Sequence, residues 1–241
     1  MFVFLAIAFA GSFVLFGVGT GFGGLQDIIL QEQAVGGGPT EDEARDAIKE
    51  NPNNAEAYHD LSTALQAEGK LDEAIPPLAK YVQMQGSDLD AKRELAGLYL
   101  RKAEGHRREA QIAQVNLQNE APGQTFQPPS DTDIGQALQP DAITSAVAAK
   151  YNAQLNAALT AMQNAYTRAV SVYKQVVAAA PQDASAQLEL AQTAEAANDL
   201  TTAIAAYKKF VELAPEDQSA PAVRDRIEQL EAANVAAGAG G

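Results

Sequence analysis

A recurring distance of 34 residues constrains this chain more than any other feature of its sequence. Leu61 and Leu95 lie 34 positions apart, and so do Ala169 and Ala203. A period of this length is typical of stacked helix–turn–helix units, each of which buries its apolar face against its neighbours. The spacing therefore predicts an elongated helical repeat rather than a single globular core.

The units share a motif of large and small apolar residues. The first helix of a unit is indicated by Tyr58-x2-Leu61-Ser62-x2-Leu65, Lys92-x2-Leu95-Ala96-x2-Tyr99 and Gln187-x2-Leu190-Ala191-x2-Ala194, and the second by Ala74-x3-Leu78, Ala169-x3-Tyr173 and Ala203-x3-Tyr207, with closing prolines at Pro181 and Pro215. These motifs resemble the tetratricopeptide repeat, a 34-residue helix–turn–helix. The resemblance covers about residues 52–215 apart from one long insertion. No tryptophan opens a unit, and Gly86 stands where a closing proline is usual.

One distance departs from the pattern. The leucine of the first helix precedes the alanine of the second by 13 positions in the first unit, at Leu61 and Ala74, and by 13 again in the last unit. In the middle unit Leu95 and Ala169 are 74 positions apart. The middle unit is therefore predicted to be complete, with 61 residues inserted between its two helices.

Turn residues support this interpretation. Gly69 and Asn198 stand where the first helix of each outer unit should end, and both residue types tolerate the left-handed conformation that closes a helix. The equivalent residue of the middle unit is Ala103, which favours continuation of the helix.

We therefore predict two long antiparallel helices, over about 89–119 and 141–180, with coiled-coil spacing of their apolar and small residues. Their outer parts form an arm that protrudes by roughly 25–30 Å, at 1.5 Å per residue, with a proline-rich tip loop at 120–140. An alternative places a turn at Gly105 and makes the following residues a complete second helix that ends at Pro122.

The first 24 residues carry no charge, and 20 helical residues would span the ~30 Å hydrocarbon core of a membrane. We expect a retained single-pass transmembrane anchor here. A cleaved signal peptide is the alternative, because Ala8-Phe9-Ala10 imitates a cleavage site. No Lys or Arg precedes Arg45, so the positive-inside rule has no charges to count here, and a missing basic leader is a further alternative. We expect the body of the protein to face away from the cytoplasm, in a bacterial envelope.

Composition fits an all-α fold, because alanine is abundant and aromatic residues make up 6% of the chain. The fold class is thus all-α: tetratricopeptide-like repeats with an inserted helical hairpin, an N-terminal transmembrane helix and a C-terminal capping helix. The predicted organisation is an anchor (1–24), a juxtamembrane segment and flexible linker (25–51), a first repeat (52–88), a second repeat with the arm (89–181, arm about 104–164), a third repeat (182–215), a capping helix (216–234) and a disordered tail (235–241).

Several function classes are disfavoured. The net charge of −14 argues against nucleic acid as a partner. With no cysteine, and with two histidines that lack ligand or catalytic neighbours at the required spacing, we expect no enzyme activity, no cofactor and no metal. The sequence has one basic run, formed by Arg101, Lys102, Arg107 and Arg108. This run is interpreted either as a solvated helix face or as a docking patch for an acidic partner or anionic headgroups.

The resemblance implies a binding face lined by the first helix of each unit, where a protein or peptide partner would lie. The residues expected on this face are Glu56, His59, Thr63, Arg93, Gly97, Leu100, Arg101, Leu188, Gln192 and Glu195. Arginine and leucine there suit a partner segment with apolar and acidic side chains, although several of these residues could instead pack one helix against another. The predicted function is a membrane-anchored interaction scaffold or adaptor that uses this face or the arm. The alternatives are a structural protein that self-associates through the arm and a secreted soluble repeat module.

Overall fold

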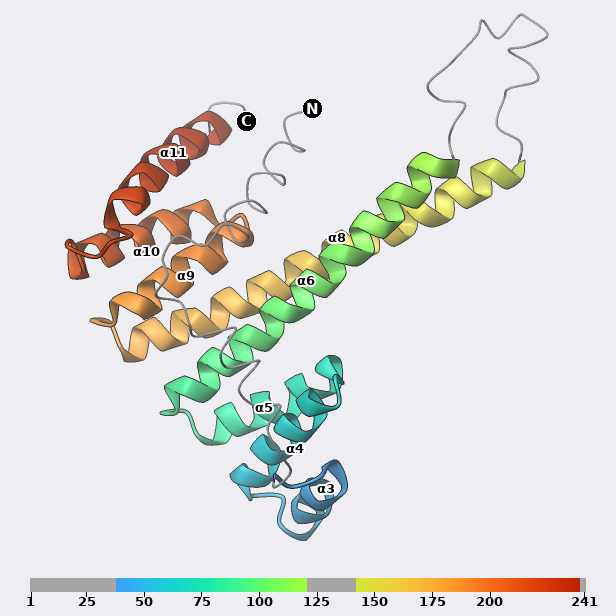
Figure 1. The fold of residues 1–241 in the computed structure, drawn as a ribbon, viewed down its shortest axis with the longest axis vertical. Helices are drawn as coiled ribbons and strands as arrows, with labels where there is room; N and C mark the ends of the chain where they lie inside the picture. Colours follow the sequence, from blue (N-terminus) through green and yellow to red (C-terminus); the bar gives the residue numbers. More distant parts are fainter. Residues whose placement is uncertain (1–37, 121–141, 239–241) are drawn as a thin grey trace, which may run out of the picture. The chain divides into compact units, whose positions relative to one another are not determined.

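The computed structural model describes residues 38–120 and 142–238, and this part contains eight helices and no strand (Figure 1). The all-α expectation is confirmed for this part of the chain. The helices are α3 (Glu41–Glu50), α4 (Ala55–Ala67), α5 (Leu71–Met84), α6 (Leu89–Glu120), α8 (Ala142–Ala179), α9 (Ala184–Ala196), α10 (Leu200–Leu213) and α11 (Ala220–Gly238). The chain divides into two compact units: Tyr99–Tyr166 forms the second, and the residues before and after it form the first.

The anchor predicted over residues 1–24 and most of the predicted tip loop lie outside the described residues. None of the described helices is both long enough and apolar enough to cross a membrane.

The first unit contains two helical hairpins with the same turn. Helix α4 packs on α5, and α9 packs on α10. Gly69 and Asn198 have φ angles of 74° and 57°, in the left-handed region. Directly after each of them, a backbone N–H donates to the carbonyl five residues earlier, Lys70 to Leu65 and Asp199 to Ala194, both at 2.8 Å. These bonds satisfy carbonyls that a helix end leaves without partners, so the turns predicted at Gly69 and Asn198 are confirmed.

The middle repeat has no such turn. Helix α6 continues through Ala103, which is fully buried, and through Gly105 to Glu120, close to the predicted limits of 89–119. Helix α8 covers 142–179, where 141–180 was predicted. The alternative turn at Gly105 is therefore wrong.

The repeat spacing also predicts the core. It places twelve residues there, Tyr99 and eleven others, and the eleven are at most 8% exposed: Leu61, Leu65, Ala74, Leu78, Leu95, Ala169, Tyr173, Leu190, Ala203, Tyr207 and Phe210. Tyr99 is half-buried. Burial of these residues is the main source of stability for the repeats, because removal of apolar surface from water contributes ~25 cal/mol per Å².

In the second unit, small side chains fill the contact between the helices. Ala110 and Ala113 of α6 are buried, as are Ala158 and Ala165 of α8. Such small residues let two helices pack closely, and Figure 1 shows the two ribbons side by side here. A partly buried polar contact also joins the two helices, in which the Tyr166 hydroxyl donates to Glu104 Oε1 at 2.8 Å.

Helix α11 covers the end of the repeat stack. Val223, Ile227 and Leu230 are buried, and α11 packs on α10, as expected for a capping helix. The helix begins at Ala220 and ends at Gly238, so residues 235–238, which were predicted to belong to a disordered tail, are helical instead.

At the other end, one prediction needs correction. Residues 41–50, which the sequence reading placed in a flexible linker, form α3, and α3 packs on α4. A capping box starts this helix, because Glu43 N–H donates to Thr40 Oγ1 and Thr40 N–H donates to the Glu43 carboxylate.

Candidate functional site on the first helices of the repeats

The first helices of the three repeats are α4, α6 and α9, and side chains on their shared face form polar contacts between neighbours. We call this surface of the first unit the A-helix face. Between α4 and α6, His59 Nε2 lies 3.1 Å from Glu94 Oε2. Gln66 Nε2 donates to the other oxygen of Glu94 at 2.7 Å. Glu94 thus joins two positions of α4 that lie about two helical turns apart to α6.

The next contact along the face joins α6 to α9. Arg93 Nε donates to Glu189 Oε2 at 3.2 Å, and Arg93 Nη2 donates to Asp183 Oδ2 at 2.5 Å. Asp183 also caps α9, because its Oδ1 accepts the N–H of Ala186 at 3.1 Å. A single guanidinium therefore fixes the beginning of α9 and its second turn against α6.

These two contacts occupy the same place in successive repeats. His59 and Glu94 are 35 positions apart, and Arg93 and Glu189 are 96 apart. The difference is the 61-residue insertion inferred from the apolar spacing. The same contact between neighbouring first helices is thus repeated on both sides of the inserted arm, and we call this pair of contacts the polar ladder.

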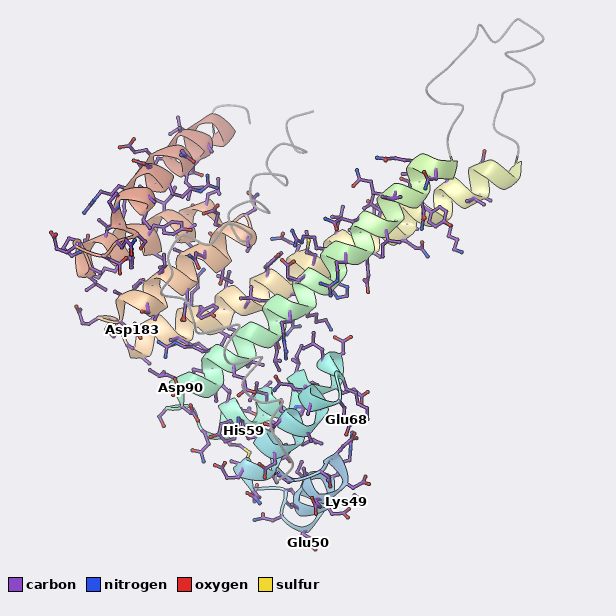
Figure 2. The ribbon with its side chains drawn as sticks, viewed as in Figure 1. Lys49, Glu50, His59, Glu68, Asp90 and Asp183 are labelled. Atoms are coloured by element: carbon purple, nitrogen blue, oxygen red, sulfur yellow. The ribbon has the colours of Figure 1, made fainter. Side chains whose placement is uncertain are left out.

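The ladder is partly shielded from water. The side chains of Arg93 and Glu189 are 27% and 23% exposed. Burial raises the pKa of the Glu189 carboxyl, and neighbouring Arg93 opposes that rise. Asp90 also lies near Arg93, with Oδ1 3.4 Å from Nη1, although its own side chain is almost fully exposed. One cation therefore faces three carboxylates, and Figure 2 labels two of them, Asp90 and Asp183.

The environment of His59 is also acidic. Its ring lies 4.9 Å from the ring of Tyr81, whose hydroxyl donates to Asp88 Oδ2 at 2.8 Å and whose pKa is raised to about 12 by that bond. The contact with Glu94 raises the pKa of His59, burial opposes it, and the nearby carboxylates of Glu56 and Asp60 raise it further. These carboxylates thus raise the pKa of His59, labelled in Figure 2, above that of a free histidine.

A third set of contacts joins α9 to the capping helix. Arg226 of α11 forms an ion pair with Glu195, and the Tyr207 hydroxyl donates to the other oxygen of the same carboxylate at 3.0 Å. Leu188, one of the residues expected on the binding face, is 6% exposed. The α9 part of the face therefore serves largely to pack and fix neighbouring helices.

The structure places the ten predicted site residues in different environments. Three are exposed on the A-helix face: Glu56, Thr63 and Gln192. Half-buried there are His59, Arg93, Gly97 and Glu195, and Leu188 is buried. Leu100 and Arg101 belong to the second unit, where Leu100 is half-buried and Arg101 exposed. Partner binding by these ten residues stays a prediction.

Sequence reasoning missed the acidic side of the ladder. Glu94, Glu189 and Asp183 were not among the predicted site residues. However, Glu94 pairs with His59, and Glu189 and Asp183 pair with Arg93. Their signal was present: Glu94 directly follows Arg93, and Glu189 directly follows Leu188, at the same place in each repeat.

The basic run of the arm is partly neutralised within its own helix. Arg107 lies 2.5 Å from Glu104, and His106 Nδ1 lies 2.8 Å from Glu109. Arg108 is exposed and has no charged partner among residues 38–120 and 142–238. In the same described ranges, no group of three or more His, Cys, Asp or Glu side chains is placed to hold a metal ion.

Comparisons with known proteins bear on the repeats. Two family models, both described as tetratricopeptide repeat, match residues 145–218 and residues 44–75. These segments contain α8 to α10 and α4, so the resemblance inferred from the sequence is supported at both ends of the repeat body. No curated protein sequence matches this chain significantly.

Several solved structures are similar to this chain at low identity. MamA residues 41 to the end, from Desulfovibrio magneticus, is 20% identical, with 74% of this chain and 96% of that chain covered and a TM-score of 0.24. A thermophilic tetratricopeptide-repeat protein from Thermus thermophilus is 20% identical, over 79% and 88%, at 0.25. YrrB, described as having an unusual peptide-binding site, is 16% identical, over 77% and 100%, at 0.25. At these values the likeness does not extend to what those proteins bind or how they assemble.

Proposed function

We propose that this chain is a membrane-anchored scaffold that binds a protein segment along the A-helix face. Tetratricopeptide-repeat proteins generally mediate interactions between proteins, and the two matched segments of this chain support membership of that class. Residues 1–24 would hold the chain in the membrane with the body outside the cytoplasm. No catalytic role is part of this proposal.

The observation that supports it most directly is the polar ladder. The ladder ties α4 to α6 and α6 to α9 through half-buried side chains. A face held in this way is preorganised, so a partner would not have to supply the free energy needed to order it. The exposed side chains of Glu56, Thr63 and Gln192 are then available to contact a partner.

The ladder also changes the expected chemistry of the partner. The sequence reading assumed that Arg93 would attract acidic side chains, but Arg93 already lies beside Asp90, Asp183 and Glu189. An acidic segment would meet an excess of carboxylates there, and like charges in contact disfavour binding. We therefore expect a partner segment with neutral or basic side chains at this point of the face.

Anchoring would compensate for modest affinity. A binding module held at the membrane meets a partner in the same membrane at a raised effective concentration, so a weak intrinsic contact is sufficient for capture. Fractionation of cells should place the full chain with membranes, and release of the chain by high salt or its recovery in a processed soluble form would contradict the anchor.

Site-specific photocrosslinking tests the binding face. A photoreactive amino acid is placed at Thr63 or Gln192 in the full chain, and at Ala205 on the exposed side of α10 as the matched control. We expect the two face positions to capture a shared partner in intact membranes and the control to miss it. The same products at all three positions, or none at Thr63 and Gln192, would rule out the A-helix face as the binding site.

A further inference from the structure

Two large apolar side chains on the α6 side of the arm are left uncovered by its own hairpin. Ile112 and Val115 of α6 are 61% and 53% exposed, whereas Ala110 and Ala113 between and beside them are buried against α8. Residues three apart on a helix lie on one face, so Ile112 and Val115 form a single exposed apolar spot. Exposed large apolar residues next to each other are typical of a binding surface.

This spot belongs to a longer stripe with coiled-coil spacing. Along α6 the positions alternate by four and three residues, in the order Arg101, Gly105, Arg108, Ile112 and Val115. All are exposed except Gly105, which is half-buried and whose absent Cβ would meet nothing within 4 Å. We call these five residues the arm seam. It is basic towards the beginning of α6 and apolar towards its end, and a regular alternation of three and four suits a partner helix.

Helix α11 has a second stripe of the same kind on its exposed side. Its positions follow the same alternation, in the order Pro221, Asp225, Glu228, Ala232 and Val235, and all five are exposed. Val235 is 72% exposed. Asp225 and Glu228 form no ion pair with any residue that the structure describes. We call these residues the cap seam; it is acidic towards the beginning of α11 and apolar towards its end.

The two seams are complementary when the helices run in the same direction. Residue numbers then differ by a constant 120, which places Arg108 opposite Glu228 and Val115 opposite Val235. The same alignment puts small Ala232 opposite large Ile112, a combination that interdigitates well. In the opposite direction Arg108 would still face Glu228, but Arg101 would face Val235 and Ile112 would face Asp225, so the apolar matching favours the parallel pairing.

We propose that the arm seam of one copy of this chain binds the cap seam of a second copy. Each copy leaves both of its seams exposed, so one copy can offer its arm while its α11 receives the arm of another. Such a contact uses two different surfaces and joins copies head to tail into rings or open chains. The interface is small, and chains concentrated in one membrane plane would associate where dilute ones would not. The inference goes beyond the proposed function, which requires only a partner on the A-helix face.

Disulfide crosslinking tests this contact, because the natural chain contains no cysteine. Two copies of the full chain with different tags are produced together, one with Val115→Cys and the other with Val235→Cys, and isolated membranes are oxidised with copper–phenanthroline. We expect a mixed dimer that carries both tags. The matched control replaces Val235→Cys by Ala233→Cys, which is also exposed on α11 but lies about 160° away around the helix, at 100° per residue; its yield should be at background.

Charge reversal is the second part of the test. Arg108→Glu in the first copy should lower the yield of the mixed dimer by about fivefold or more, because like charges then face each other across the seam. Glu228→Arg in the second copy should restore it. Helicity should stay unchanged, since both residues are exposed on helix surfaces.

Three outcomes would overturn the proposal: no mixed dimer above the control, a disulfide formed by Val115→Cys between two arms instead, or a product found only when both cysteines are in one chain. Photocrosslinking at Thr63 in the same membranes keeps the two proposals separate. Capture at Thr63 that survives Arg108→Glu leaves the A-helix face in place even if the seams do not meet.

Discussion

Replacement of Arg93 by methionine is the perturbation that tests the polar ladder most directly. Methionine keeps an unbranched apolar stem of similar length, so the packing of α6 is retained while the charge and the hydrogen bonds to Glu189 and Asp183 are lost. We expect the repeat body to be destabilised because Glu189 is left half-buried without its cation. Asp183 keeps its role as the cap of α9.

The magnitude follows from the exposure of the groups. A hydrogen bond to a charged group contributes about 1.5–3 kcal/mol, and loss of one partner of a fully buried ion pair costs about 3–5 kcal/mol. The side chains of Arg93, Glu189 and Asp183 are 27%, 23% and 33% exposed, so water screens part of the charge that is left behind. We therefore expect the free energy of unfolding to fall by about 2–3 kcal/mol, between those limits.

The loss should depend on pH. Burial raises the pKa of Glu189, and Arg93 opposes that rise, so removal of the arginine should raise this pKa further. A carboxyl whose pKa is higher in the folded than in the unfolded state adds stability below its unfolded pKa, and this stability is lost as the pH rises through the folded value. The deficit of Arg93→Met should thus be larger near pH 8 than near pH 5.

The assay is urea unfolding of residues 39–241, followed by circular dichroism at both pH values. Lys209→Met is the matched control, because Lys209 forms an exposed pair with Glu212 within one helix and should change the stability by no more than about 0.5 kcal/mol. The double variant Arg93→Met with Glu189→Gln should regain part of the loss, since no charge is then left unpaired at Glu189. A deficit equal to that of Lys209→Met, or one that does not change with pH, would show that the contact with Glu189 does not hold α6 to α9.

Three further predictions concern other parts of the chain. The contact with Glu94 raises the pKa of His59, so it should add stability below about pH 6.5 that is lost as the pH rises through the folded value, and the difference between wild type and His59→Asn in urea should be larger at pH 6 than at pH 8.5, by a few tenths to about 1 kcal/mol. Replacement of residues 104–164 by a Gly-Asn turn should leave a folded, helical body in which Arg93→Met has the same effect as in the full chain, and an unfolded product would show that the arm is needed by the repeats. Ala110→Leu should destabilise the hairpin by about 1–3 kcal/mol, as hydrogen exchange of the arm amides would show, whereas Gln111→Leu on its exposed side should not.

The long-range architecture could be predicted because its signals are local and periodic. Gly69 and Asn198 adopt the left-handed conformation at the positions where the spacing required turns. An alanine such as Ala103 adopts the left-handed conformation only at a cost in free energy, and α6 continues through it. The limits of α6 and α8 could be predicted from the unbroken spacing of small and apolar residues, because these residues form the contact between the two helices.

Helix α3 was missed although its signal is local. Its sequence begins with Thr40 and Glu43 in capping-box spacing, but only Ala44 is fully buried along it. The apolar stripe of this ten-residue helix is short, with Ala44, Ala47 and Ile48 on one face, and helices this short form chiefly because they dock on a neighbour, here α4. The predicted linker therefore has to be shortened at its end.

The candidate site was predicted only in outline. Repeat spacing correctly placed His59 and Arg93 at equivalent positions of the first helices, because periodicity identifies the face of a helix. It could not show that Glu189, 96 positions away, would take up the charge of Arg93, since spacing alone does not reveal pairings between helices. Because this pairing was not predicted, Arg93 was assumed to be available to a partner, and an acidic partner was expected for that reason.

The position of the insertion keeps the residues of the two proposed interaction surfaces in different parts of the chain. On α6 the ladder residues Arg93 and Glu94 precede Leu98, where the first unit ends, whereas the arm seam is drawn from residues 101–115 of the second unit. Lengthening the helix at Ala103 therefore changes no contact of the ladder, and the 35-residue step between neighbouring first helices is kept once the insertion is subtracted. The A-helix face depends on residues that the insertion leaves in place, and the arm can expose Ile112 and Val115 without disturbing it. A variant at Arg108 should consequently alter contacts between copies and leave partner capture unchanged, and a variant at Thr63 should do the reverse.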